Sequence, residues 1–178
     1  NICFSPERIN PGDKSSQLKN LTKIVSGNTK HSVKEAVKVY KKITKNVVVA
    51  KNIKSAELAK IIENAQRDLN ISFMNEVYEI CDLYELDYKH ILSLCRTKWN
   101  FVDFKPGLVG GHCVPVDPYY LIEGLKNKGF KSNILHTSRK INEKFVYYIF
   151  QKILKRLNKI NFKKIFFFGI NFKDNVLD

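Results

Sequence analysis

The stretch from Ser55 to Leu86 constrains the fold most, because its apolar side chains recur at intervals of three and four residues. That spacing places them along one face of an α-helix. At a rise of 1.5 Å per residue, one helix over this stretch is roughly 45 Å long. Such a helix is more typical of a connector or an oligomer interface than of the edge of a small domain. The apolar positions are Leu58, Ile61, Ile62, Ala65, Leu69, Phe73, Val77, Ile80 and Tyr84.

The residues before this helix predict a strand, a helix and a second strand. Residues 1–12 contain turn-forming residues and are predicted to be a loop, whereas Lys23–Gly27 is a short apolar run that ends at a glycine. Ser32, followed by Glu35 three residues later, has the pattern of a capping box and predicts a helix start. Asn46–Ala50 holds three consecutive valines, which is typical of a buried strand in a parallel sheet.

The residues after the long helix predict three shorter helices and then a new strand. Asp117 followed by Pro118 is typical of an N-cap before the first helical residue, and Gly129 ends that helix. We therefore expect an α/β chain whose helical middle is flanked by two incomplete α/β parts, with boundaries at residues 1–52, 53–158 and 159–178. The predicted elements are helices over 87–95, 118–128 and 132–157, a loop over 97–113, and a strand over 164–170.

Charge, hydropathy and cysteine usage narrow the possible functions. The net charge of +14, from 31 Lys and Arg against 17 Asp and Glu, suits an anionic partner, but the lysines are scattered as on solvated faces. Nucleic-acid binding needs aromatic side chains beside the basic ones, whereas these aromatics lie on the apolar faces of predicted helices. No apolar run reaches the length of a membrane span, and four cysteines without C-x-x-C spacing favour a reducing compartment. We expect a cytoplasmic protein with no membrane or nucleic-acid partner.

The residues around Cys113 predict a nucleophilic site. Gly107, Gly110 and Gly111 allow close backbone approach, and a thiol just before a helix start ionises more easily. The alternative is that Cys113 is a small buried apolar residue. The adjacent His112 suggests a metal, but no second ligand pair lies nearby, so we expect none.

Lys60 and Asn64 are four residues apart on the predicted long helix, so they project from one face. Two hydrogen-bond donors, one of them cationic, can stabilise an oxyanion that forms between them. Taken alone, the pair is more typical of a solvent-exposed lysine beside an ordinary surface asparagine.

Four separated motifs resemble the UDP-glucose/GDP-mannose dehydrogenase family of nucleotide-sugar 6-dehydrogenases. They are most similar to the branch that acts on UDP-N-acetylglucosamine and UDP-N-acetylgalactosamine. The resemblance implies the end of a Rossmann-like NAD domain, a helical central domain, and the start of a C-terminal UDP-sugar-binding domain in the three parts given above. The motifs are Ser5–Asp13, Ala56–Asn64 with its continuation to Glu76, Gly107–Tyr120, and Gly169–Asp174.

The resemblance also implies a mechanism. The family oxidises the C6 alcohol of the sugar to a carboxylate with two NAD molecules in succession, through a thiohemiacetal and a thioester on a cysteine. Cys113 is then the nucleophile, and Lys60 and Asn64 stabilise the oxyanions. Asp117 positions or deprotonates the water or alcohol, and Glu7 is the base for thioester hydrolysis. Asp117 as a helix cap, and Glu7 in a loop ion pair with Arg8, are the structural alternatives.

Substrate and cofactor contacts follow from the same resemblance. Glu7 and Cys113 are expected to border the NAD site, although no G-x-G-x-x-G follows a strand in this sequence. Because the first residue is Asn1 and the last apolar run predicts the first strand of a new unit, we expect a fragment. The length of the central helix favours a homodimer that pairs through it, and the resemblance implies a role in surface polysaccharide synthesis. UDP-glucose, UDP-ManNAc or GDP-mannose as the substrate, and a truncated relative that only dimerises, remain open. The expected substrate-binding residues are Phe104, Gly107, Leu108, Gly110, Gly111, Arg139 and Lys173.

Overall fold

The computed structural model describes residues 1–9, 18–160 and 164–166, and these form two compact units. The first unit holds residues 1–63 and the second begins at residue 64, within the long helix. Lys173 and the predicted strand beyond residue 166 lie outside the described residues. The expected domain boundaries at residues 52 and 158 stay predictions.

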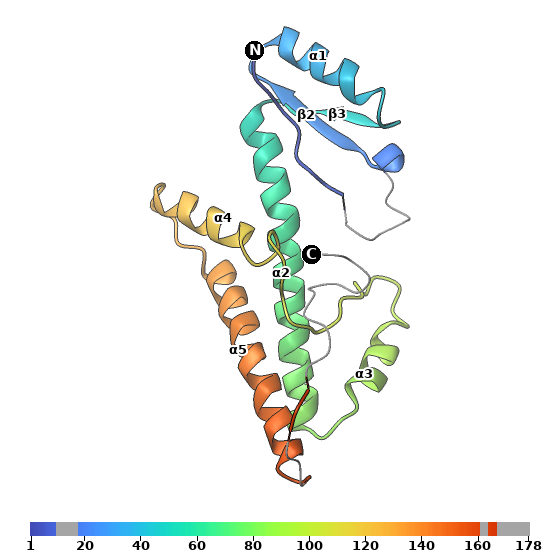
Figure 1. Cartoon of the computed structure of the whole chain (residues 1–178), viewed down its shortest axis with the longest axis vertical. Coiled ribbons are helices and arrows are strands. Elements are labelled where there is room, and N and C mark those ends of the chain that lie inside the picture. Colours follow the sequence, from blue (N-terminus) through green and yellow to red (C-terminus); the bar gives the residue numbers. More distant parts are fainter. Residues whose placement is uncertain (10–17, 161–163, 167–178) are drawn as a thin grey trace. The chain divides into compact units, whose positions relative to one another are not determined.

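The first unit holds a small sheet, a helix that connects two of its strands, and the start of the long helix. Strand β2 (Lys23–Gly27) pairs in parallel with β3 (Val47–Val49), and α1 (Lys30–Tyr40) connects them, as predicted. Strand β1 (Cys3–Phe4) pairs antiparallel with β2, so the sheet order is β1-β2-β3 (Figure 1). A 3-10 turn, η1 (Leu18–Asn20), precedes β2. β1 was not predicted, because two residues are too few to show an alternating pattern.

Helix α1 begins three residues before the predicted start, and Ser32 is not its cap. Thr29 is the N-cap, and its hydroxyl accepts a hydrogen bond from the Ser32 N–H at 3.1 Å. Ser32 is buried, and its hydroxyl donates to the Asn28 side chain at 2.9 Å. A Cβ at Gly27 would lie 2.8 Å from the Ser32 Cβ, so the start of α1 packs closely on the end of β2.

The prediction that the valine strand is buried is wrong for the described residues. Val48 and Val49 are 53% and 52% exposed. Among the residues that the structure describes, strand β3 is the last in the sheet order and pairs only with β2. The continuous valine run therefore identified a parallel strand correctly but not its burial.

The second unit is helical, and its helices follow the predicted ones closely. The long helix α2 (Ile53–Leu83) enters it from the first unit, and α3 (Tyr88–Cys95), α4 (Asp117–Lys126) and α5 (Asn133–Leu157) complete it (Figure 1). Side-chain caps start two of them: Asp87 on α3 and Ser132 on α5. The prediction that Asp117 caps α4 is wrong, because Val116 takes that position and Asp117 is already helical.

The core of this unit lies where α4 and α5 meet α2. Ala65, Ile122 and Leu135 are buried together, with Leu121 and Leu125 packed against them. Farther along α2, an aromatic cluster continues the contact with α5. Its rings are Tyr78, Tyr88, Phe145 and Tyr148. This packing fixes α2 and α5 side by side, and both run in the same direction (Figure 1).

Candidate active site

Cys113 lies in the loop directly before α4, as predicted, and it is exposed. Its carbonyl oxygen accepts hydrogen bonds from the N–H groups of Val116 at 3.1 Å and Asp117 at 2.8 Å. Gly111, two residues earlier, has φ +84°, a conformation that side chains rarely adopt. The alternative of a buried, structural cysteine is therefore wrong, and the thiol is open to a ligand.

Asn64 on α2 binds Asp117 at the first turn of α4. The Asn64 Nδ2 donates to the Asp117 carboxylate at 2.6 Å, and Asn64 is 5% exposed. This contact explains why Asp117 does not cap its own helix. It also excludes the alternative that Asn64 is an ordinary surface residue. The second unit thus joins Asn64, Asp117 and Cys113 through hydrogen bonds.

Lys60 lies on α2 one turn before Asn64 and is half-buried. Four residues of helix separate the two along the axis by about 6 Å. Lys60 and Glu7 belong to the first unit, whereas Asn64, Asp117 and Cys113 belong to the second. The three residues of the second unit are the ones that the structure brings together.

Glu7 is held as an anion by its own loop. Its carboxylate accepts hydrogen bonds of 2.7 Å from the N–H groups of both Arg8 and Ile9, and the Lys23 ammonium lies 3.7 Å away. Partial burial raises its pKa, but the two backbone hydrogen bonds and the charge of Lys23 outweigh this, so the pKa lies below its usual 4.5. The Arg8 guanidinium pairs with Glu63 at 2.8 Å, so the predicted alternative of a Glu7–Arg8 ion pair is wrong.

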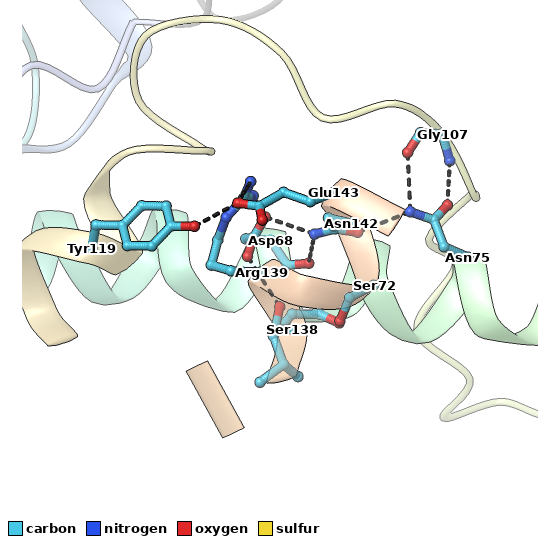
Figure 2. Close-up of polar contacts among 10 residues, drawn as sticks. Asp68, Ser72, Asn75, Gly107, Tyr119, Ser138, Arg139, Asn142 and Glu143 are labelled. Atoms are coloured by element: carbon cyan, nitrogen blue, oxygen red, sulfur yellow. Dashed lines mark hydrogen bonds and ion pairs between the residues drawn. The ribbon is translucent and has the colours of Figure 1, made fainter. Parts of the chain in front are cut away.

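Arg139 of α5, an expected substrate contact, lies inside a buried polar network. Its guanidinium donates to Asp68 of α2 at 2.6 Å and stacks over the Tyr119 ring at 5.6 Å (Figure 2). Ser138 also donates to Asp68, at 3.0 Å. Tyr119 in turn donates to Glu143, and this hydrogen bond and burial raise the Tyr119 pKa. The substrate role of Arg139 stays a prediction, beside a structural role that the contacts show.

Sequence reasoning missed Asn75, whose amide binds the backbone of Gly107 at the start of the cysteine loop (Figure 2). A signal was present, because four polar residues recur at helical spacing along the predicted long helix and all four are buried. Buried polar groups of this kind need partners. The four residues are Asn64, Asp68, Ser72 and Asn75.

The other expected substrate residues lie along the segment before Cys113. Leu108 is 60% exposed, Gly110 is exposed, and Phe104, Gly107 and Gly111 are half-buried. Within residues 1–9, 18–160 and 164–166, no group of three or more His, Cys, Asp or Glu side chains is arranged to hold a metal ion. In the same residues, no helix is both long and apolar enough to cross a membrane.

Known proteins share this fold and are similar in sequence. The native structure of the UDP-N-acetyl-mannosamine dehydrogenase Cap5O from Staphylococcus aureus matches with a TM-score of 0.82 at 27% identity, over 99% of this chain and 40% of that chain. Protein CapL of Staphylococcus aureus is 43% identical over 182 residues, and UDP-N-acetyl-D-glucosamine 6-dehydrogenase of Salmonella typhi is 40% identical over 182 residues. Each match covers 99% of this chain and 43% of the relative.

The fold is thus that of a nucleotide-sugar dehydrogenase central region. Residues 54–144 match the central-domain model of the UDP-glucose/GDP-mannose dehydrogenase family, and the chain belongs to that family. The chain spans 43% of the length of the two curated relatives described above.

Proposed function

We propose that this chain forms the central part of an NAD-dependent dehydrogenase that oxidises the C6 alcohol of a UDP-N-acetylhexosamine to a carboxylate. The observation that carries the proposal is the hydrogen bond from Asn64 to Asp117 beside the exposed Cys113. A thiol, a buried amide donor and a carboxylate are the groups that aldehyde oxidation through a thioester requires. The family membership and the sequence similarity to relatives named for UDP-N-acetylhexosamines support the same reaction.

In the proposed reaction, Cys113 forms a covalent bond to the substrate carbon. The C6 alcohol first loses a hydride from its carbon, which NAD would accept, and its hydroxyl proton, and so becomes an aldehyde. The thiolate then adds to the aldehyde carbon, and the carbonyl oxygen becomes an alkoxide that takes up a proton to give a thiohemiacetal. Loss of a hydride from that carbon, with the hydroxyl proton, leaves a thioester. Water then attacks the thioester carbon, the C–S bond breaks, and the thiolate of Cys113 is restored.

The residues around Cys113 supply charge and proton transfer. The Asn64 amide donates one of its two hydrogens to Asp117, and in this proposal it donates the second to the oxyanion. Lys60, one turn away on α2, adds a positive charge in this proposal. Asp117 orients the attacking water or the alcohol. Glu7, which its low pKa keeps ionised at neutral pH, accepts the proton released during hydrolysis.

NAD, when bound, accepts the two hydrides that this four-electron oxidation releases. The described residues include the parallel pair β2–β3 joined by α1, a unit from which dinucleotide-binding sheets are built. The sequence has no G-x-G-x-x-G after a strand, so these residues do not provide the pyrophosphate site. We therefore assign only Glu7 and Cys113 to the border of the cofactor site.

UDP-ManNAc is the second candidate substrate, with the same chemistry. It is favoured by the fold match to a UDP-N-acetyl-mannosamine dehydrogenase with a TM-score of 0.82. The residues proposed to contact the sugar nucleotide lie in the segment from Phe104 to Gly111, with Arg139 and Lys173 in addition.

Release of NADH by the full-length gene product tests the proposed function. The protein is given NAD and, in turn, UDP-GlcNAc, UDP-GalNAc, UDP-glucose, UDP-ManNAc and GDP-mannose, with Cys113→Ser as the matched variant. We expect two NADH per sugar with one preferred substrate, and no complete oxidation by the variant. No NADH with any sugar would exclude the proposed function, and a fully active Cys113→Ser would exclude the thioester route.

The cellular setting is proposed from the same resemblance. All four cysteines are free, as expected for a protein in the reducing cytoplasm. A uronic acid made from a UDP-N-acetylhexosamine is a precursor for surface polysaccharide. Detection of the uronic-acid product in the cytoplasmic fraction, and its loss when the gene is deleted, would test the cytoplasmic location and the supply of this precursor.

A further inference from the structure

The side chain of Asn75 forms three hydrogen bonds deep inside the second unit. Its Oδ1 accepts from the Gly107 N–H at 2.8 Å, and its Nδ2 donates to the Gly107 carbonyl oxygen at 3.1 Å. The same Nδ2 donates to the Asn142 Oδ1 at 2.8 Å, and Asn75 is fully buried (Figure 2). One amide thus pairs with both backbone groups of a single loop residue, which fixes the position and the direction of the chain at Gly107.

The orientation of the Asn75 amide is itself determined by α5. Asn142 uses its Nδ2 to donate to the Asp68 carboxylate at 2.7 Å and to the Asp68 carbonyl at 3.0 Å. Its Oδ1 therefore faces Asn75 and can only accept, so Asn75 must present its Nδ2. Arg139 and Ser138 hold Asp68 in turn. The contact with Gly107 is thus one end of a buried hydrogen-bonded network between α2 and α5.

The two ends of the cysteine loop are held by the same face of α2. Gly107 at one end is bound by Asn75, and Asp117 at the other end is bound by Asn64. Asn64 and Asn75 are eleven residues apart, which is about three helical turns, so they project in the same direction. Between the two contacts lies Cys113, in a stretch whose glycines cannot restrict its position.

We propose that Asn75 is a positioning residue for Cys113. Together with Asn64 it binds the two ends of the loop 107–117 to α2, and so fixes the position of the thiol relative to the substrate. This proposal rests on the proposed function of Cys113. Asn75 acts through Gly107 and touches no reacting atom. A misplacement of about 1 Å at a reacting group is enough to slow catalysis on the order of 100-fold.

Asn75→Asp in the full-length gene product tests the proposal. The carboxylate has nearly the same shape but turns lone pairs toward the Gly107 carbonyl and the Asn142 Oδ1, so two of the three hydrogen bonds are lost. We expect kcat to fall by about 10- to 100-fold with the KM for NAD unchanged, because the loop moves and the pyrophosphate site does not. Amide hydrogen exchange over residues 108–112 should become at least about tenfold faster.

Ser72→Ala is the matched control. It removes a 2.8 Å hydrogen bond to the Leu69 carbonyl oxygen of the same helix, from a buried position near Asn75 in the sequence. We expect kcat and loop exchange to stay at wild-type values in this variant. A folded Asn75→Asp with wild-type kcat and exchange would overturn the proposal, as would an equal loss of kcat in Ser72→Ala.

If Asn75→Asp does not fold, hydrogen exchange in the wild-type protein tests whether Asn75 holds the loop at Gly107. The Gly107 amide should then exchange at least about tenfold more slowly than the amides of Leu108 and Gly110, and equal rates would overturn the proposal. Exchange also separates the two proposals. If no sugar is oxidised, the proposed function fails, whereas the exchange of residues 107–112 still shows whether Asn75 holds the loop.

Discussion

The hydrogen bond between Asn64 and Asp117 joins an amide to a carboxylate, and such charge-assisted bonds are the stronger ones in proteins. Asp117→Asn keeps the size of the side chain and removes the charge that orients the Asn64 amide. We expect kcat to fall by about 10²- to 10⁴-fold, as for loss of a proton-transfer group. Unfolding should cost about 1.5–3 kcal/mol less than in the wild type. Steady-state NADH release and urea unfolding measure the two effects.

Glu123→Gln on the same helix is the control for Asp117→Asn. Glu123 is exposed and pairs with Lys126 at 2.6 Å, and surface pairs of this kind contribute little. We expect it to change neither kcat nor the urea midpoint measurably. An Asp117→Asn protein that behaves like Glu123→Gln would remove Asp117 from the site.

Glu7 gives a prediction for the dependence of stability on pH. Its folded pKa lies below the unfolded value, so ionised Glu7 stabilises the fold above about pH 4.5, and this contribution is lost as the pH falls through the folded pKa. We expect Glu7→Gln to melt below the wild type at pH 7. The difference should vanish in acid, and melting curves from pH 7 to pH 3 would show it. A constant difference across that range would contradict the assigned pKa direction.

At the scale of the element, the contact between α2 and α5 depends on a buried ion pair. Asp68 and Arg139 are 1% and 7% exposed in their side chains. Removal of one partner leaves an uncompensated buried charge, so we expect Asp68→Ala to destabilise by about 3–5 kcal/mol. The exposed pair Arg96–Asp103 is the comparison, and Asp103→Ala should destabilise the fold far less than Asp68→Ala. Denaturant unfolding of both variants measures the two losses in the free energy of unfolding. Equal losses would contradict the claim that the buried pair contributes more than the exposed one.

The helices were predictable because the residues that determine each one lie within it or next to it in the sequence. The apolar spacing over Ser55–Leu86 predicts α2, and the predicted starts at Asp87 and Ser132 each lie one residue before α3 and α5. The start of α1 was misplaced because Thr29 and Ser32 both suit a cap, and only the packing of Gly27 on Ser32 decides between them. Burial depends on neighbours that local patterns do not contain.

The site was predictable only in part, for a similar reason. Cys113 and the spacing of Lys60 and Asn64 follow from local motifs. In contrast, the contact of Asn75 with Gly107 joins residues 32 positions apart, and that of Asn64 with Asp117 joins residues 53 apart. The buried polar residues on α2 could have indicated that partners exist, but not which ones. Long-range pairing of this kind requires the fold.

At the scale of the whole molecule, α2 presents an apolar face that is exposed in the chain described. Leu58, Ile62, Phe73 and Ile80 lie on one side of the helix and are 44%, 50%, 57% and 47% exposed. We propose that a second copy of the chain covers this face, as the length of the helix led us to expect. Exposed apolar patches of this kind mark interaction sites.

Phe73→Glu tests the proposed dimer, because it places a charge in the middle of that face. We expect the full-length gene product to shift from dimer to monomer in light scattering. Leu94→Glu, which changes an equally exposed residue on α3, should leave the dimer intact. A monomeric wild type, or a dimeric Phe73→Glu, would contradict this interface.

The central claim is that Cys113 carries the substrate as a thioester, and mass spectrometry of a slowed variant tests it most directly. Glu7→Gln in the full-length gene product, mixed with NAD and the preferred UDP-sugar, should hydrolyse the thioester slowly and accumulate it. We predict a mass increase equal to the bound acyl sugar nucleotide, located on the peptide that contains Cys113. An NADH burst of two per site with an unmodified Cys113 would contradict the account.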